Sequence, residues 1–501
     1  MNKFHLARRD FLKTITAIGI SISGMFTVFS SFAGASRPDK LKAFKGVLVA
    51  RSDPAFLRWF WGMTWYDKKP KRFPAIIAQP KDVDDIKLLM DYANQTGHRI
   101  ALRSSGHNIT APPLRNNAIT IDMSLLNQVE VDEKSLTAWA GPGVLSQELN
   151  EITFKHGLVF PSAHTGFVAI GGFLLGGGMG WNMPAYGMAC GSVLGAELML
   201  ADGSIVTVSE VENTDLYWAM RGVGPGFFAI VLRYKLKLHT APTAVMNTFY
   251  IPMDKIKSGL DEVLTLIPEN DKRSEILGSL GRFSPPGTPE GEQCWNLVLN
   301  VISFGKTKDE ALSIANIFNN SKLPEICSLQ NVHNRVLNYL DLFEALGGTD
   351  SYSTVRTSET AFFTDQPDVA LPIIAQILES EAVDSRSFGF TVIDTNPTAP
   401  EDCSFTYWAP HYISWYLIGV TEEAISSNKN LMKKLNAAIA PFAKGYYINE
   451  VDLSIAPYMA NQSFSLDKWN KLVSLREKYD PKNRFFSYIG HEKNGSIYND
   501  L

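Results

Sequence analysis

A glycine-dense segment, Gly-Gly-Phe-Leu-Leu-Gly-Gly-Gly-Met-Gly at residues 171–180, constrains the fold of this chain more than any other stretch. These glycines are too closely spaced for an ordinary strand or helix, and glycine lets the backbone adopt positive φ and approach a ligand closely. A second turn, Arg103-Ser104-Ser105-Gly106-His107-Asn108, follows an apolar run. Successive backbone N–H groups in such turns form concavities that bind anions. Two such turns, roughly seventy residues apart, predict a long, phosphate-bearing cofactor within reach of His107.

Neither turn matches a standard nucleotide-binding motif. The Gly-x-Gly-x-x-Gly that opens a Rossmann helix is absent, and so is a phosphate loop ending in Gly-Lys-Ser/Thr. A glycine-rich connector in a large β-rich domain is therefore the alternative interpretation. A serine hydrolase is disfavoured because the chain has no Gly-x-Ser-x-Gly nucleophile elbow.

Short motifs that occur in order along most of the chain favour the cofactor interpretation. Residues 103–108 are similar to the motif Arg-Ser/Gly-Gly-Gly-His-Ser of a flavoprotein family. Further similar segments are Ile121-Asp122-Met123-Ser124, Ala140-Gly141-Pro142-Gly143, Ala201-Asp202-Gly203, 213–222 and 478–485. On these motifs the chain resembles the FAD-linked oxidases with a PCMH-type (p-cresol methylhydroxylase) FAD-binding domain. These form the vanillyl-alcohol oxidase superfamily, and the resemblance is closest to its berberine-bridge-enzyme-like branch.

The resemblance implies an α+β fold. It comprises a two-part PCMH-type FAD-binding domain and a substrate domain, whose antiparallel sheet is covered by helices and lies over the flavin. The expected parts are a lead-in at 36–69, the FAD-binding domain at 70–240, the substrate domain at 241–430 and a C-terminal segment, 431–501, that returns to the FAD-binding domain.

Local patterns predict three elements of this fold. Residues 80–97 have the apolar periodicity of an amphipathic helix and lie between two apolar runs, which predicts a β-α-β unit. Residues 232–238 alternate between apolar and basic side chains, as in a half-buried strand. The apolar pattern of residues 467–479 predicts a helix. The helix is expected to end at Asp480-Pro481, because proline disfavours helical backbone in the residue before it.

The N-terminus has the pattern of an export signal. Arg8 and Arg9 precede an uncharged apolar run from Thr14 to Phe32, and Ala33-Gly34-Ala35 resembles a cleavage site. Twin arginines indicate the bacterial Tat machinery. We therefore expect residues 1–35 to be removed, and the enzyme to be periplasmic or secreted without stable membrane insertion. A retained anchor is the alternative, because the apolar run is nearly long enough to span a bilayer.

Composition limits the other classes of function. Hydrophobic residues make up 45% of the chain and charged residues 20%, as in a globular protein. The net charge of −4 gives no basic surface for nucleic acid, so a small molecule is the expected partner. Cys190, Cys294, Cys327 and Cys403 include no Cys-x-x-Cys pair, so neither a metal site nor thioredoxin chemistry is predicted. Whether any of them forms a disulfide stays open.

The resemblance also assigns roles at the cofactor site. The family histidine that matches His107 bonds covalently to the 8α-methyl group of FAD. Many relatives have a second tether through a cysteine, but Thr165 holds that position here, so a single covalent bond is expected. Val168 lies where valine tends to accompany oxygen reactivity, whereas Ala169 replaces a glycine. The other expected cofactor-binding residues are Arg103, Ser104, Ser105, Gly106, Asn108, Gly171, Gly172, Gly176, Gly177, Gly178 and Asn449.

Substrate oxidation needs a base that takes a proton while hydride leaves carbon. A tyrosine can act as this base if its pKa is lowered or its anion is stabilised. Tyr186 and Tyr447 match tyrosines of the family, and Tyr416 and His411 lie on an expected substrate-domain strand. Each of them is also explained by ordinary packing.

The sequence therefore predicts an FAD-dependent oxidase that takes hydride from a C–H bond next to oxygen or nitrogen. The expected substrate is an alcohol, a sugar or a secondary metabolite, and the expected acceptor is O₂, which would be reduced to H₂O₂. Two alternatives stay open. One is a dehydrogenase with another acceptor, and the other is a secreted binding protein on a degenerate FAD fold.

Overall fold

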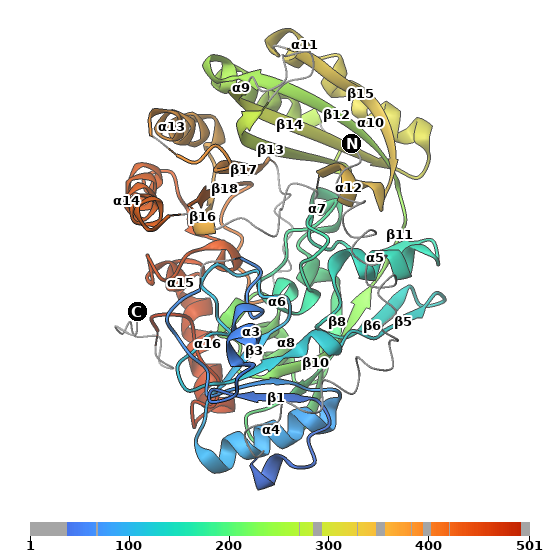
Figure 1. Cartoon of the computed structure of the whole chain (residues 1–501). Helices are drawn as coiled ribbons and strands as arrows, with labels where there is room; N and C mark the ends of the chain where they lie inside the picture. The colour runs from blue at the N-terminus through green and yellow to red at the C-terminus, as the bar shows by residue number, and fades with distance from the viewer. Residues whose placement is uncertain are drawn as a thin grey trace, which may run out of the picture.

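The computed structural model describes residues 38–66, 69–269, 271–283, 293–327, 329–346, 356–381, 383–393, 402–419 and 421–491. The predicted signal peptide lies outside the described residues. Figure 1 shows two units, one built mainly from the first half of the chain and one dominated by a large sheet with helices on its outer side. Within the described ranges, no helix is both long enough and apolar enough to cross a membrane.

The first sheet delivers the histidine turn. Its strand order is β1-β2-β4-β3, with β4 parallel to both of its neighbours and β1 antiparallel to β2. The strands are β1 (Val47–Ala50), β2 (Ile76–Gln79), β3 (Ile100–Arg103) and β4 (Ile119–Asp122). The predicted helix at 80–97 is confirmed as α4 (Val83–Thr96), where Asp82 caps the N-terminus and Gly97, at φ +80°, ends the helix. Because β3 ends at Arg103, the next residues leave the sheet at the carboxyl end of its parallel strands, where ligands tend to bind.

The second sheet shares a buried core with the first and is antiparallel, in the order β5-β6-β10-β8-β9. Its strands are β5 (Val129–Asp132), β6 (Thr137–Ala140), β8 (Val193–Met199), β9 (Ile205–Ser209) and β10 (Ile230–Lys237). The alternation predicted at 232–238 is confirmed in β10, where Leu232, Tyr234 and Leu236 are buried. A short ribbon pairs β7 (Leu158–Val159) with β11 (His239–Thr240).

The second unit is a large antiparallel sheet in the order β15-β12-β14-β13-β17-β18-β16-β19. Its strands are β12 (Thr243–Pro252), β13 (Ser274–Phe283), β14 (Cys294–Gly305), β15 (Leu329–Asn338), β16 (Arg356–Thr364), β17 (Phe388–Ile393), β18 (His411–Ile418) and β19 (Gly445–Tyr446). The helices that cover it are α9 (Ile256–Leu266), α10 (Lys308–Asn319), α13 (Pro367–Ser380) and α14 (Glu422–Ile439). The expected α+β class and helix-covered antiparallel sheet are confirmed. The expected boundary at residue 430 falls inside α14.

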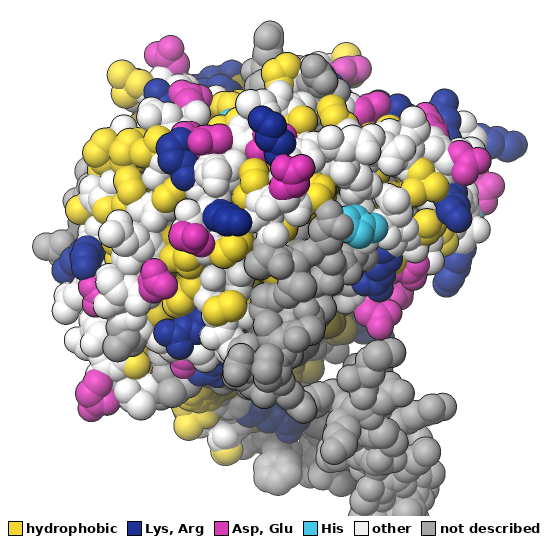
Figure 2. All heavy atoms as spheres, turned by 90° about the horizontal axis from the view of Figure 1, so that it is seen from above, with side chains coloured by type: hydrophobic (Ala, Val, Ile, Leu, Met, Phe, Trp, Pro, Cys, Tyr) yellow, Lys and Arg dark blue, Asp and Glu magenta, His cyan; other side chains and the backbone are white. Residues whose placement is uncertain are grey.

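The remaining helices are short, apart from the last one. They are α3 (Phe56–Trp61), α5 (Ser146–Phe154), α6 (Ile170–Leu175), α7 (Met183–Tyr186), α8 (Thr214–Met220), α11 (Leu323–Ile326), α12 (Asp341–Leu346), α15 (Met459–Gln462) and α16 (Leu466–Tyr479). The helix predicted at 467–479 is confirmed as α16. Seen from above, over the second unit, basic and acidic side chains are interspersed with apolar ones across the described surface (Figure 2).

Alternate side chains of β18 lie in two different environments. Ile413, Trp415 and Leu417 join the core that includes the covering helices. On the opposite face, Tyr412 packs in a second cluster and Tyr416 lines a cavity against the first unit. Side chains two residues apart on a strand share a face, so β18 presents a row of hydroxyl groups toward the first unit.

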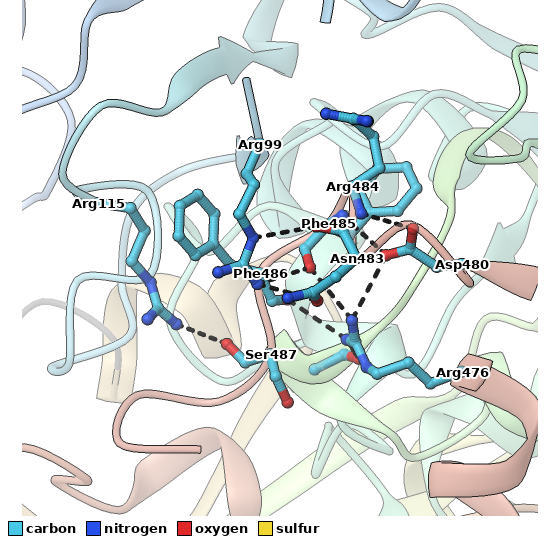
Figure 3. Close-up of polar contacts among 10 residues, drawn as sticks. Arg99, Arg115, Arg476, Asp480, Asn483, Arg484, Phe485, Phe486 and Ser487 are labelled. Atoms are coloured by element: carbon cyan, nitrogen blue, oxygen red, sulfur yellow. Dashed lines mark hydrogen bonds and ion pairs between the residues drawn. The ribbon is translucent and has the colours of Figure 1, made fainter. Parts of the chain in front are cut away.

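Residues 445–491, which lie within the predicted C-terminal segment 431–501, contact both units. This stretch begins as β19 beside β16 and ends with Phe485 bridged to Ile100 of β3. Figure 3 shows the contacts that hold this end. The Asp480 carboxylate accepts a hydrogen bond from the backbone N–H of Phe485 at 2.8 Å and lies 3.7 Å from the Arg476 guanidinium. Arg99 donates to the carbonyl oxygen of Phe485 at 3.1 Å.

We expect Asp480→Ala to lower the free energy of unfolding by about 3 kcal/mol, because Arg476 would keep a buried charge without its counter-ion. Urea denaturation measures this change. Asp467→Ala is the control on the same helix, because Asp467 is exposed in the first turn of α16, and its effect should stay within about 1 kcal/mol. An equal decrease in the free energy of unfolding of both variants would contradict a special role for Asp480.

Candidate functional site

A cavity of about 380 Å³ lies where the two units meet. One wall comes from the end of β3 and the turn after it, and a second from residues 163–175. Phe485 and Phe486 of the C-terminal segment line one part of the cavity. The second unit contributes Ser279, Leu346, Glu359, Phe388, Phe390 and Tyr416. The cavity therefore joins a glycine-rich region to an aromatic chamber beneath the large sheet.

His107 is held firmly at the wall of this cavity. Its ring stacks on Trp65, with centroids 5.1 Å apart and planes at 17°. The indole Nε1 of Trp65 donates to the His107 carbonyl oxygen at 3.0 Å, and His107 Nδ1 lies 2.9 Å from Ser105 Oγ. Gly106 before it has φ +76°, and a Cβ there would lie 2.3 Å from the carbonyl oxygen of Met63. The turn therefore requires glycine at 106, and the imidazole keeps a defined position.

The glycine-dense segment divides into two parts with different roles. At the start of α6, a Cβ on Gly172 would meet no atom within 4 Å, so this backbone is open to the cavity. A Cβ on Gly171 would lie 2.4 Å from Ser104 Oγ, which shows how closely the two turns approach. Gly176, Gly177 and Gly178 do not line the cavity but pack against Asn449, Phe405 and Phe173. Close packing also explains the absence of side chains at these three positions, and their role in binding the cofactor stays a prediction.

Most of the other predicted site residues do meet in the cavity. Those that line it are Arg103, Ser104, Ser105, Gly106, His107, Asn108, Thr165, Val168, Gly171, Gly172, Tyr416, Tyr447 and Asn449. Arg103 forms an ion pair with Asp122 at 2.8 Å, while its Nε is buried with no hydrogen-bond partner among the described residues. That donor is available to an oxygen of a bound ligand.

The predicted tyrosine bases differ in location. Tyr447 lines the cavity, where burial raises its pKa well above the ordinary value, and Asn449 Nδ2 lies 3.3 Å from its hydroxyl oxygen. Tyr186 lies outside the cavity lining and stacks on His239 with centroids 3.9 Å apart. Burial also raises the pKa of Tyr186 and lowers that of His411, which does not line the cavity, to about 4. Burial disfavours the anion of both tyrosines, whereas the Asn449 amide donates a hydrogen bond to the Tyr447 hydroxyl oxygen, a contact that stabilises a tyrosinate. The role of base therefore stays a prediction for Tyr447, Tyr186 and Tyr416.

Sequence reasoning missed a carboxylate at the site. Glu450, directly after Asn449, lines the cavity and accepts hydrogen bonds from the hydroxyl groups of Tyr412 and, at 2.6 Å, Tyr416. The alternation of tyrosine and serine in the otherwise apolar β18 was the available signal. It could not identify Glu450 as the partner, because the two segments are distant in sequence.

Sequence comparison identifies the first unit. Residues 74–209 match the family described as FAD binding domain. The FAD-linked oxidoreductase penO of Penicillium crustosum is 36% identical over 209 residues, which are 41% of this chain and 46% of that protein. The chain thus spans about half the length of these curated relatives.

Solved structures share the fold over most of this chain. The 6-hydroxy-D-nicotine oxidase from Arthrobacter nicotinovorans has a TM-score of 0.75 at 20% identity, covering 91% of this chain and 99% of that one. Wild-type BBE-like 1 of Physcomitrella patens has a TM-score of 0.76 at 16% identity, covering 89% and 97%. At such identities the likeness shows the fold alone. Together with the domain match, it confirms the resemblance to FAD-linked oxidases with a PCMH-type domain.

The walls of the cavity fit an FAD. Gly172 offers open backbone, the Arg103 Nε is an unused donor, and the Phe485 and Phe486 side chains provide apolar surface. No disulfide joins the four cysteines, all of which lie in the described ranges, and none of them lines the cavity.

We expect Gly172→Val to lower the amount of flavin bound per chain while the protein still folds, because the new side chain would project into the open cavity. Gly176→Val is the matched comparison. Its Cβ would lie 2.0 Å from Asn449 Oδ1, so the yield of folded protein should fall instead. Flavin absorbance per chain and soluble yield measure the two effects, and full flavin content in Gly172→Val would contradict the assignment.

Proposed function

From the FAD-binding domain at residues 74–209 and the fold of FAD-linked oxidases, we propose that this protein is an FAD-dependent oxidoreductase. In the proposed holoenzyme, one covalent bond joins FAD to His107. The observation that carries this proposal is the single cavity that connects His107 and Gly172 with the aromatic chamber of the second unit. A cofactor at the glycine-rich walls would therefore meet a substrate held under the large sheet.

The chain's own residues would hold this cofactor at both faces of the cavity. Arg103, the 104–108 turn, Gly172 and Asn449 would contact it, and the His107 imidazole supplies a nitrogen nucleophile for the tether. Thr165 lines the cavity at the position where many relatives of this type have a cysteine. Threonine has no thiol that could form a second bond to the flavin, and this supports a single covalent bond through His107. The bound FAD supplies the chemistry of hydride acceptance.

The chamber is suited to a small organic substrate. Phe388, Phe390 and Tyr416 supply apolar surface that excludes water, and Tyr447 presents a phenol that its raised pKa keeps protonated at neutral pH. Tyr447 therefore acts as a hydrogen-bond donor that orients the substrate. The reaction is hydride removal from a C–H bond next to oxygen or nitrogen, in an alcohol, a sugar or a secondary metabolite.

We propose O₂ as the electron acceptor, with H₂O₂ as its product. Val168, which the resemblance links to oxygen reactivity, lines the cavity, and this supports oxidase activity. Ala169 also lines the cavity, and its methyl group narrows the wall beside Val168. A narrower wall would restrict the access of O₂, so the presence of Ala169 favours the second candidate function, a dehydrogenase with another acceptor.

Export remains part of the proposal. The twin arginines and the small-residue site at 33–35 support release from a Tat signal, which would place the enzyme in the periplasm or outside the cell. The Tat route carries folded proteins, so the cofactor would be bound before export.

Anaerobic reduction tests the proposed function. Protein purified with FAD available should be yellow and should bleach when an alcohol, sugar or amine from a substrate panel is added without oxygen. Admission of air should then restore the colour and release H₂O₂. Recovery only with an added quinone or dye would establish the dehydrogenase, and a colourless protein would favour a binding protein on a degenerate FAD fold.

A further inference from the structure

Glu450 lines the substrate chamber, and its two carboxylate oxygens differ in their contacts. Its Oε2 accepts hydrogen bonds from Tyr416, at 2.6 Å, and from Tyr412, and both donors come from the face of β18 that points to the first unit. No contact of Oε1 occurs among the described hydrogen bonds, although Glu450 lines the cavity. The two phenols therefore fix the carboxylate, and Oε1 can bind a ligand.

Glu450 also lacks a cationic partner. In the part of the chain that the structure describes, no lysine, arginine or histidine forms an ion pair with it. The arginines that line the cavity lie with the first unit and have partners there, Arg103 at Asp122 and Arg115 at the Ser487 carbonyl oxygen. The Glu450 carboxylate therefore has no described counter-ion, and a cationic ligand would supply one.

The surroundings of Glu450 are suited to such a ligand. Tyr416 stacks on Phe388 with centroids 4.7 Å apart, and Phe390 and Tyr447 also line the chamber. Aromatic faces attract cations through their quadrupoles. Glu359 lines the same cavity and adds a second carboxylate on the neighbouring strand, opposite Tyr416 in the sheet.

We propose that the substrate is a protonated amine, that Glu450 binds its ammonium group, and that Glu450 Oε1 accepts the proton the nitrogen loses. This inference rests on the proposed function and names its substrate class. Tyr412 and Tyr416 are positioning residues. Burial and the charge of Glu450 hold the pKa of Tyr412 far above its usual value, so its phenol stays a donor throughout.

The step balances in atoms and charge. The ammonium group gives one N–H proton to Glu450 Oε1, which becomes neutral. The adjacent carbon then loses hydride, a proton with two electrons, and the bound FAD is the oxidant that receives it. The C–N bond becomes a double bond, and the iminium product keeps the positive charge that the ammonium group carried. Without removal of the N–H proton, no nitrogen lone pair is available to form that double bond.

Binding and reduction experiments test the proposal on the flavin-loaded protein. Benzyltrimethylammonium is a cationic probe without an N–H proton, and benzyl alcohol is a neutral probe with the same ring. Wild type should bind the cation about tenfold more tightly by calorimetry, and Glu450→Gln should lose that preference. The amine that bleaches wild type fastest should bleach Glu450→Gln about a hundredfold more slowly. Glu450→Asp, which keeps the charge, should recover part of the cation preference.

Glu151→Gln removes the same charge from an exposed position on α5 and should match wild type in both measurements. The proposal is overturned if alcohols or sugars bleach the flavin and no amine does, if wild type binds the cation no better than the alcohol, or if Glu450→Gln keeps the preference. Failure of the proposed function looks different, because the protein would then lack flavin or no substrate of any class would bleach it.

Discussion

A hydrogen bond between residues 341 positions apart holds the two halves of the site together: Asn108 Nδ2 donates to the carbonyl oxygen of Asn449 at 3.1 Å. It joins the residue after His107 to the segment that carries Tyr447 and Glu450. The side chain of Asn449 also fills the space over Gly176, so a larger residue at 176 would push this segment away. The cavity and the position of its carboxylate depend on this closure of the C-terminal segment onto the first unit.

The ends of the cavity differ in charge. The first unit lines it with Arg103 and Arg115, whereas the second unit and the C-terminal segment contribute Glu359 and Glu450. Donors and open backbone suit an anionic, phosphate-bearing cofactor, and carboxylates among aromatic rings suit a neutral or cationic substrate. This asymmetry gives one continuous cavity two binding preferences, and the imidazole of His107 lies on the cofactor side.

Local features of the sequence predicted much of this fold. The cap residue, the C-terminal glycine and the apolar residues of the helix at 83–96 all lie within one short stretch of sequence. In β10, apolar residues that are buried alternate with basic residues that are more exposed. The histidine turn was predictable for the same reason, since Gly106 and His107 act within one short loop. Features that depend on distant partners were not predictable. Gly176 packs on Asn449, and Tyr186 stacks on His239. Glu450 contacts Tyr416 only when the C-terminal segment lies beside β16.

In the proposed holoenzyme, FAD occupies this cavity and is bonded to His107. Mass spectrometry of peptides from the digested, flavin-loaded protein tests it most directly. The peptide containing His107 should carry the mass of the flavin, and no other peptide should. Flavin on another residue, or an unmodified His107 peptide together with free FAD in the digest, would contradict the claim.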